Sequence, residues 1–120
     1  MSGVHVSGLR FTEICIDAHD TRVLADWWAR ALGWPVEPTE DEGDWLLRAP
    51  AGPDWLFLPV PETKTVKNRI HFDFTPHDQQ AEVQRLLALG ARHVDIGQGE
   101  QSWVVLADPE GNEFCVLAAE

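Results

Sequence analysis

Two side chains capable of acid–base or metal chemistry, His71 and Asp73, stand two positions apart in one short segment. Apolar and polar residues alternate along it, in the order Ile70, His71, Phe72, Asp73, Phe74 and Thr75. A period of two predicts a β-strand with one apolar face and one polar face. The apolar face needs a helix to cover it, so the polar face is left to water or to a site.

A second segment with the same alternation lies 58 residues closer to the N-terminus, and the two segments can be aligned at this offset. Glu13 then falls on His71, and the pair His19-Asp20 falls on His77-Asp78. Further pairs at this offset are Trp45 with Trp103, Leu47 with Val105, and Phe57 with Cys115. A register shared over about fifty residues predicts an internal duplication.

Each half of the duplication predicts one strand, one helix and three further strands. The first half, about residues 10–59, has strands predicted at 11–17, 34–38, 45–48 and 55–59, with a helix from Asp20 to Gly33. The second half, about residues 69–118, has strands predicted at 70–75, 92–96, 103–107 and 113–117, with a helix from Asp78 to Gly90. Residues 60–68 would link them. Neither half can bury both faces of its sheet alone, so we expect a single α+β domain over residues 1–120. In it, two βαβββ modules form a curved, barrel-like sheet with the helices outside and a cavity inside.

The strand faces that point away from the helices are expected to share this cavity. The helix-facing residues would be Ile14, Ile16, Ile70, Phe72, Phe74, Phe114 and Val116. The cavity-facing residues would be Glu13, Cys15, Asp17, His71, Asp73, Glu113 and Cys115. Glu13 and His71 are the candidate catalytic residues, and with Glu113 they are the candidate metal ligands. The alternative is a hydrogen-bonded Glu13–His71 pair beside a Cys115 thiol that acts as a small apolar group.

Aromatic residues next to the cavity form a second candidate site. Trp55, Phe57, Trp103, Asp73 and Cys115 are the candidate ligand-binding residues. Stacked aromatic rings bind flat or cationic molecules, which is the functional interpretation. The alternative is that the rings fill the core or a dimer contact.

Composition limits the partners. The formal net charge of −11 argues against binding to nucleic acid, because phosphate contacts need clustered Lys and Arg. No apolar run approaches the roughly eighteen residues of a membrane span, and no basic-then-apolar leader begins the sequence. We therefore expect no membrane partner and a cytoplasmic location. Two cysteines, Cys15 and Cys115, do not make a disulfide framework.

Three motifs, added to the duplicated βαβββ plan, carry a family resemblance. They are Asn-Arg-Ile-His-Phe-Asp at 68–73, Leu-Gly-Ala-Arg at 89–92 and Asp-Pro-Glu-Gly-Asn-Glu-Phe-Cys at 108–115. With them, nearly the whole chain from Phe11 resembles a glyoxalase-like domain of the vicinal oxygen chelate superfamily of glyoxalases, bleomycin-resistance proteins and extradiol dioxygenases. The resemblance implies metal ligands at the positions of Glu13, Phe57, His71 and Cys115. Only His71 matches a usual ligand, and Phe57 replaces an acid, so the ligand set is incomplete.

The resemblance implies two alternative functions. One is an enzyme with one divalent metal, acting as a lyase, isomerase or dioxygenase on a small oxygenated substrate. The other is a metal-free protein that sequesters a drug or metabolite, as an antibiotic-resistance protein does. His71 opposite Glu13 favours the enzyme, whereas the missing ligand, the acidic charge and the tryptophans favour the binding protein. The resemblance also implies a homodimer, with or without exchange of modules.

Overall fold

Two copies of one βαβββ unit follow each other along the chain, and the structure, a computed structural model, describes residues 8–120. The first module contains β1 (Glu13–Ala18), α1 (Thr21–Leu32), β2 (Val36–Pro38), β3 (Trp45–Leu47) and β4 (Asp54–Pro59). The second contains β5 (Phe72–Phe74), α2 (Gln79–Ala88), β6 (Arg92–His93), β7 (Val104–Ala107) and β8 (Glu113–Val116). The predicted α+β class and the tandem modules are confirmed. The first seven residues of the predicted domain lie outside the described residues.

An aspartate begins each helix at the position that the sequence predicts. Asp20 accepts a hydrogen bond from the backbone N–H of Val23 at 3.2 Å, and Asp78 accepts one from Ala81 at 3.1 Å. Each bond satisfies an N–H group that the first helical turn leaves free. Gly33 ends α1 with a φ of 73°, a left-handed conformation that glycine adopts without strain. No helix within residues 8–120 is long and apolar enough to cross a membrane.

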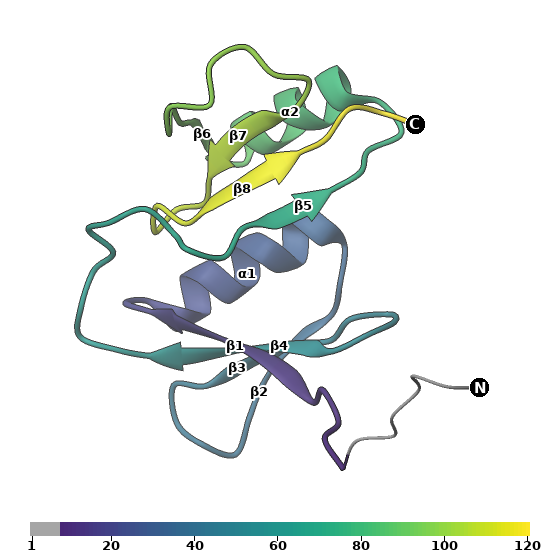
Figure 1. Cartoon of the computed structure of the whole chain (residues 1–120). Helices are drawn as coiled ribbons and strands as arrows, with labels where there is room; N and C mark the ends of the chain where they lie inside the picture. The colour runs from purple at the N-terminus through teal and green to yellow at the C-terminus, as the bar shows by residue number, and fades with distance from the viewer. Residues whose placement is uncertain (1–7) are drawn as a thin grey trace.

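Hydrogen bonding divides the strands into two four-stranded mixed sheets of the same plan. Their strand orders are β1-β4-β3-β2 and β5-β8-β7-β6. The first strand of each module runs parallel to its last strand, and the other pairs are antiparallel. In Figure 1 the two sheets lie on opposite sides of α1, and α2 covers the second sheet. Each sheet is therefore covered on one face and open on the other.

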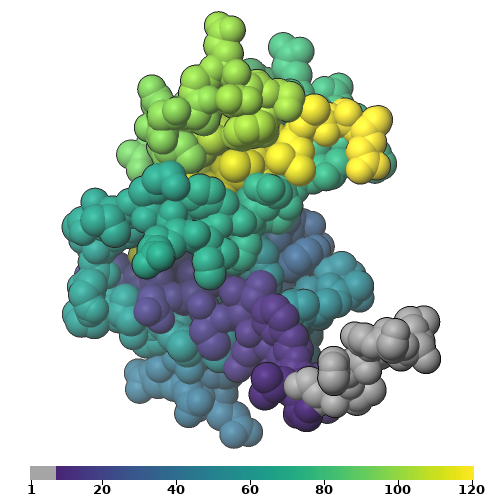
Figure 2. Space-filling view, in the orientation of Figure 1, coloured from purple at the N-terminus to yellow at the C-terminus, as the bar shows by residue number. Residues whose placement is uncertain are grey.

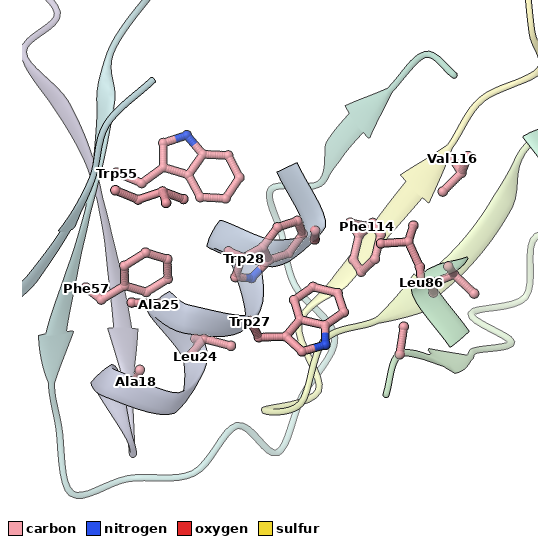
Figure 3. Close-up of a cluster of buried hydrophobic side chains, with 14 of the residues drawn as sticks. Ala18, Leu24, Ala25, Trp27, Trp28, Trp55, Phe57, Leu86, Phe114 and Val116 are labelled. Atoms are coloured by element: carbon pink, nitrogen blue, oxygen red, sulfur yellow. The ribbon is translucent and has the colours of Figure 1, made fainter. Parts of the chain in front are cut away.

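Helix α1 joins the cores of the two modules. Figure 3 shows Trp28 between residues of the first sheet and Phe114 of the second. The ring centroid of Trp28 lies 5.2 Å from that of Trp55 and 4.9 Å from that of Phe114. Trp28 is only 3% exposed. Because buried aromatic rings contribute a large share of the hydrophobic stabilisation of a small domain, this shared core fixes the modules relative to each other.

The two modules superimpose with different sequence offsets in different strands. The N-caps of the helices keep the expected offset of 58 residues. In the last two strands, however, Trp45 pairs with Phe57 and Val104 pairs with Val116, so the offset there is 59 residues. The predicted alignment of Phe57 with Cys115 is therefore wrong by one position. Because successive strand residues face opposite sides, this shift turns Phe57 into the core, where it is 0% exposed.

The strand predicted at 70–75 begins two residues late, at Phe72. Ile70, which was expected to face a helix, is instead 77% exposed at the end of the linker. The backbone N–H of Asn68 bonds to the side chain of Glu113, which holds the approach to β5 away from strand pairing. Trp103 likewise precedes β7 rather than beginning it.

Candidate functional site

A hollow of about 770 Å³ lies between the two modules. Its apolar wall is formed by Phe11, Ile14, Ile16, Trp28, Ile70, Phe72 and Phe114. Its polar positions are Cys15, Asp17, Asn68, Arg69, Asp108, Asn112 and Glu113. In Figure 2 the linker (teal) lies against the first strand (purple) on the front of the molecule. A concave, mainly apolar hollow of this size suits a small organic molecule.

Glu113, at the start of β8, is a buried carboxylate with both oxygens already bonded. Its Oε2 accepts a hydrogen bond from Lys64 Nζ at 2.6 Å, and its Oε1 accepts one from the backbone N–H of Asn68 at 2.6 Å. Burial acts to raise the pKa of Glu113, but the two donors and the charge of Lys64 outweigh it and lower the pKa below its usual value. Glu113 is therefore ionised and paired with an internal cation.

Asp108 is a second buried carboxylate, held by donors from both modules. Its Oδ2 accepts from Trp28 Nε1 at 2.9 Å, and its Oδ1 accepts from the backbone N–H groups of Glu110 and Asn112, each at 3.0 Å. Burial raises the pKa of Asp108, although these hydrogen bonds lower it in part. The Trp28–Asp108 bond fixes α1 of the first module to the turn before β8.

Four of the sequence-predicted site residues come together on the open face of the second sheet. A smaller hollow of about 340 Å³ is lined there by His71, Asp73, Ile96, Gln98, Trp103, Cys115 and Leu117. Burial raises the pKa of Cys115, and the charge of Asp73 and a hydrogen bond with its carboxylate raise it further. The thiol is therefore protonated at neutral pH, which makes it a weak nucleophile and a weak metal ligand.

His71 is half-buried at the edge of this smaller hollow. Its Nε2 atom lies 3.0 Å from the carbonyl oxygen of Asn68 and 3.3 Å from Lys67 Nζ. A carbonyl oxygen only accepts and a lysine ammonium only donates, so the two contacts require opposite tautomers; the shorter one, to the carbonyl, assigns the proton to Nε2. In that tautomer Nδ1 is the basic nitrogen of His71.

The residues expected to share one cavity are divided between the two hollows. Asp17 and Glu113 line the hollow between the modules, whereas His71 and Asp73 line the one on the open face. Glu13 is exposed at the start of β1 and lines neither. The division arises because α1 lies between the sheets, so their open faces point away from each other (Figure 1).

The aromatic candidates are divided too. Trp103 is 36% exposed and lines the open-face hollow. Trp55 is 5% exposed and Phe57 0% exposed, and both pack in the core instead of beside a cavity. Trp55 stacks on Phe72 of the second sheet, with ring centroids 4.8 Å apart. Of the three rings, only Trp103 is placed to contact a bound molecule in this arrangement.

The donor groups of residues 8–120 do not fit a divalent metal as they are arranged. Within residues 8–120, no group of three or more His, Cys, Asp and Glu is positioned to hold one. Glu113 is neutralised by Lys64, Cys115 is a protonated thiol, and Glu13 is exposed and lines neither hollow. The metal-binding role of Glu13, His71 and Glu113 stays a prediction.

Sequence analysis missed two features that shape the inter-module hollow. The first is Lys64, which neutralises Glu113; the signal was available, because Lys64 and Lys67 are the only lysines of the chain and both lie in the linker. The second is the Trp28–Asp108 bond. Its two partners are 80 residues apart, and nothing in the local sequence pattern relates them.

Comparison with known proteins supports the fold. No curated protein matches this sequence. Among solved structures, the oxidase ChaP-H2 is 18% identical, with 95% of this chain and 96% of that chain covered and a TM-score of 0.68. The hypothetical protein SA1046 from S. aureus is 12% identical, with 94% and 96% covered and a TM-score of 0.71. TnmS3, an antibiotic binding protein from Streptomyces sp. CB03234, is 12% identical, with 97% and 100% covered and a TM-score of 0.64.

These sequence identities are low, so the structural matches show a common fold and do not show a common activity. The family comparison goes further, because a model of the glyoxalase-like domain matches residues 13–117, which is nearly the whole chain. The match spans the helices and strands of both modules. The chain therefore belongs to the glyoxalase-like domain family.

Proposed function

We propose that this chain binds a small, largely apolar molecule in the inter-module hollow and acts by sequestering it. One observation carries the proposal: the hollow of about 770 Å³ is mainly apolar, and its two buried carboxylates already have protein partners. A ligand entering it gains contact with aromatic rings and does not have to displace water from bare buried charges.

The pairing of Glu113 favours binding over metal-assisted catalysis. Lys64 Nζ and the Asn68 N–H both lie 2.6 Å from its oxygens, which is the short distance of a charge-assisted hydrogen bond. The charge of Lys64 neutralises the carboxylate, which weakens its attraction for a divalent metal. The arrangement supports a carboxylate that stabilises the wall of a pocket.

A metal-dependent enzyme is the second candidate, and the open face of the second sheet is the observation that favours it. His71 has a basic nitrogen available there, and Asp73 lies on the same hollow. Imidazole and carboxylate are ligands and proton carriers of lyases and dioxygenases alike. Further ligands would have to come from a second copy of the chain.

The related structures include both kinds of protein, since ChaP-H2 is an oxidase and TnmS3 binds an antibiotic. They therefore support a small-molecule ligand in general. The choice between sequestration and metal-dependent catalysis therefore depends on the geometry of the two hollows in this chain.

A homodimer is part of the proposal. The open face of the first sheet carries Leu56 and Leu58, which are only partly buried, and the open face of the second sheet carries the exposed Trp103. Apolar side chains on an uncovered sheet face are typical of an interface. Native mass spectrometry at micromolar concentration should give twice the mass of the chain; a monomer would contradict the dimer.

Fluorescence titration with phenylnaphthylamine, a neutral apolar dye, tests the binding function. Ile70 is 77% exposed and lines the inter-module hollow, so Ile70→Trp adds a larger ring there without entering the core. We expect this change to raise the Kd of the dye at least about tenfold, the equivalent of 1.4 kcal/mol. Val23→Trp is the matched control, because Val23 is 54% exposed on α1 and lines no hollow described here.

Equal dye binding by the original protein and Ile70→Trp would exclude the inter-module hollow as the binding site. The enzyme candidate is tested separately, by native mass spectrometry after incubation with nickel, zinc, iron or manganese. A stoichiometric metal that is lost in His71→Ala would favour the enzyme over the binding protein.

A further inference from the structure

We propose that the inter-module hollow selects molecules with an aromatic body and an acidic group, and that Arg69 binds the acidic group. Arg69 lies on a strap, residues 64–70 of the linker, which forms one wall of the hollow. This inference rests on the proposed binding function and adds the chemical class of its ligand.

Glu113 fixes the strap at two points. It binds the side chain of Lys64 and the backbone N–H of Asn68, each at 2.6 Å. The strap has no helix or strand of its own, whereas Glu113 belongs to β8 inside a four-stranded sheet. The sheet therefore positions the strap through a single carboxylate, and the next residue after Asn68 is Arg69. Glu113 is a positioning residue for Arg69.

Arg69 is the one cationic side chain among the described residues that line this hollow. It is exposed, and it makes no hydrogen bond or ion pair with any residue between 8 and 120. A guanidinium group binds carboxylates and sulfonates through two parallel hydrogen bonds, which an unengaged arginine is free to form. The same hollow is lined by the aromatic rings of Trp28, Phe72 and Phe114. Aromatic rings bind another aromatic body by offset or edge contacts.

The acidic residues that line the hollow do not repel an acidic group bound at Arg69. Asp108 and Glu113 are both held by donors of the protein. Asp17 has no such partner, but it lies where the hollow meets a smaller one lined by Lys64 and Glu110, which Arg69 does not reach. An acidic ligand would therefore bind with its charge toward Arg69 and its aromatic body against Trp28, Phe72 and Phe114.

Two fluorescent probes distinguish selectivity for an acidic ligand from the binding of any apolar ligand. Anilinonaphthalene sulfonate and phenylnaphthylamine share one aromatic skeleton, and only the first carries a negative charge. Arg69→Gln should raise the Kd of the sulfonate probe about five- to tenfold, the range between an exposed and a partly buried ion pair. It should change the Kd of the neutral probe less than about twofold. Arg22→Gln on α1 is the matched control, because it removes the same charge from an exposed position that lines no described hollow.

The strap is tested by limited digestion with trypsin, which cleaves after Lys64, Lys67 and Arg69. Glu113→Gln keeps the size of the side chain and removes its charge, so cleavage in the strap should become several-fold faster while the circular dichroism spectrum is unchanged. Lys64→Met, a second variant, removes the same ion pair and should free the strap at Lys67 and Arg69.

Three outcomes would overturn the inference or its basis. If both probes bind and Arg69→Gln affects them equally, the hollow binds apolar molecules without selecting an acid, and the proposed function stands alone. If neither probe binds, the proposed function fails, and this inference fails with it. If neither Glu113→Gln nor Lys64→Met accelerates cleavage, Glu113 does not position the strap.

Discussion

Replacing Trp28 by phenylalanine separates the hydrogen bond between the modules from the packing around it. Trp28 Nε1 donates to Asp108 at 2.9 Å, and the two residues are only 3% and 1% exposed. A hydrogen bond to a charged group contributes about 1.5–3 kcal/mol, and the space left by the smaller ring adds about 1 kcal/mol. We therefore expect Trp28→Phe to lower the free energy of unfolding by about 2.5–4 kcal/mol.

This cost should depend on pH, because Asp108 titrates. Burial raises the pKa of Asp108, and the loss of the Trp28 donor should raise it further, since the charged form loses a partner. A group whose pKa is raised by folding stabilises the protein at low pH, and that contribution is lost as the pH rises through the folded-state pKa. The cost of Trp28→Phe should therefore be greatest at neutral pH and shrink as acid protonates Asp108.

Urea unfolding followed by circular dichroism, at neutral pH and at about pH 4.5, measures both effects. Trp34→Phe is the control, because Trp34 is partly buried, packs against Trp55 with ring centroids 5.6 Å apart and donates no side-chain hydrogen bond to a described residue. We expect the control to cost less than about 1.5 kcal/mol at either pH. Equal losses for the two variants, or a loss for Trp28→Phe that does not change with pH, would refute the role assigned to the Trp28–Asp108 bond.

Three further predictions concern the helix cap, the core and the ion pair. Asp20→Ala should destabilise the protein by about 1 kcal/mol in urea unfolding, because Val23 loses its N-cap acceptor; Asp20→Ser should restore most of it. Phe57→Ala should cost about 3–5 kcal/mol, since the ring is fully buried; a cost below about 1 kcal/mol would mean that Phe57 lies at a cavity after all. The lowered pKa of Glu113 means that its contribution is present above the usual pKa of glutamate and is lost as the pH falls through the folded-state value. Melting temperature against pH should show this acid loss, and Lys64→Met should weaken it.

Much of the fold could be predicted from local pattern. The alternation around His71, the aspartates at 20 and 78 and the glycine at 33 locate strands and helices within a few residues, because each depends on neighbours in sequence. The position of Phe57 could not be predicted from the repeat. The offset between the modules changes by one residue after the helices, and a shift of one residue in a strand exchanges its two faces.

The sequence alone determined the class of this protein: two βαβββ modules and a glyoxalase-like motif set. Periodicity and motifs depend on residues that are neighbours in the sequence, so they can be recognised without the tertiary structure. Only the tertiary structure decided which side chains meet. Helix α1 packs between the two sheets, Glu13 lines neither hollow, Trp28 reaches Asp108 and Lys64 reaches Glu113. These contacts join residues up to 80 positions apart, and they depend on the packing of whole elements, which no local pattern contains.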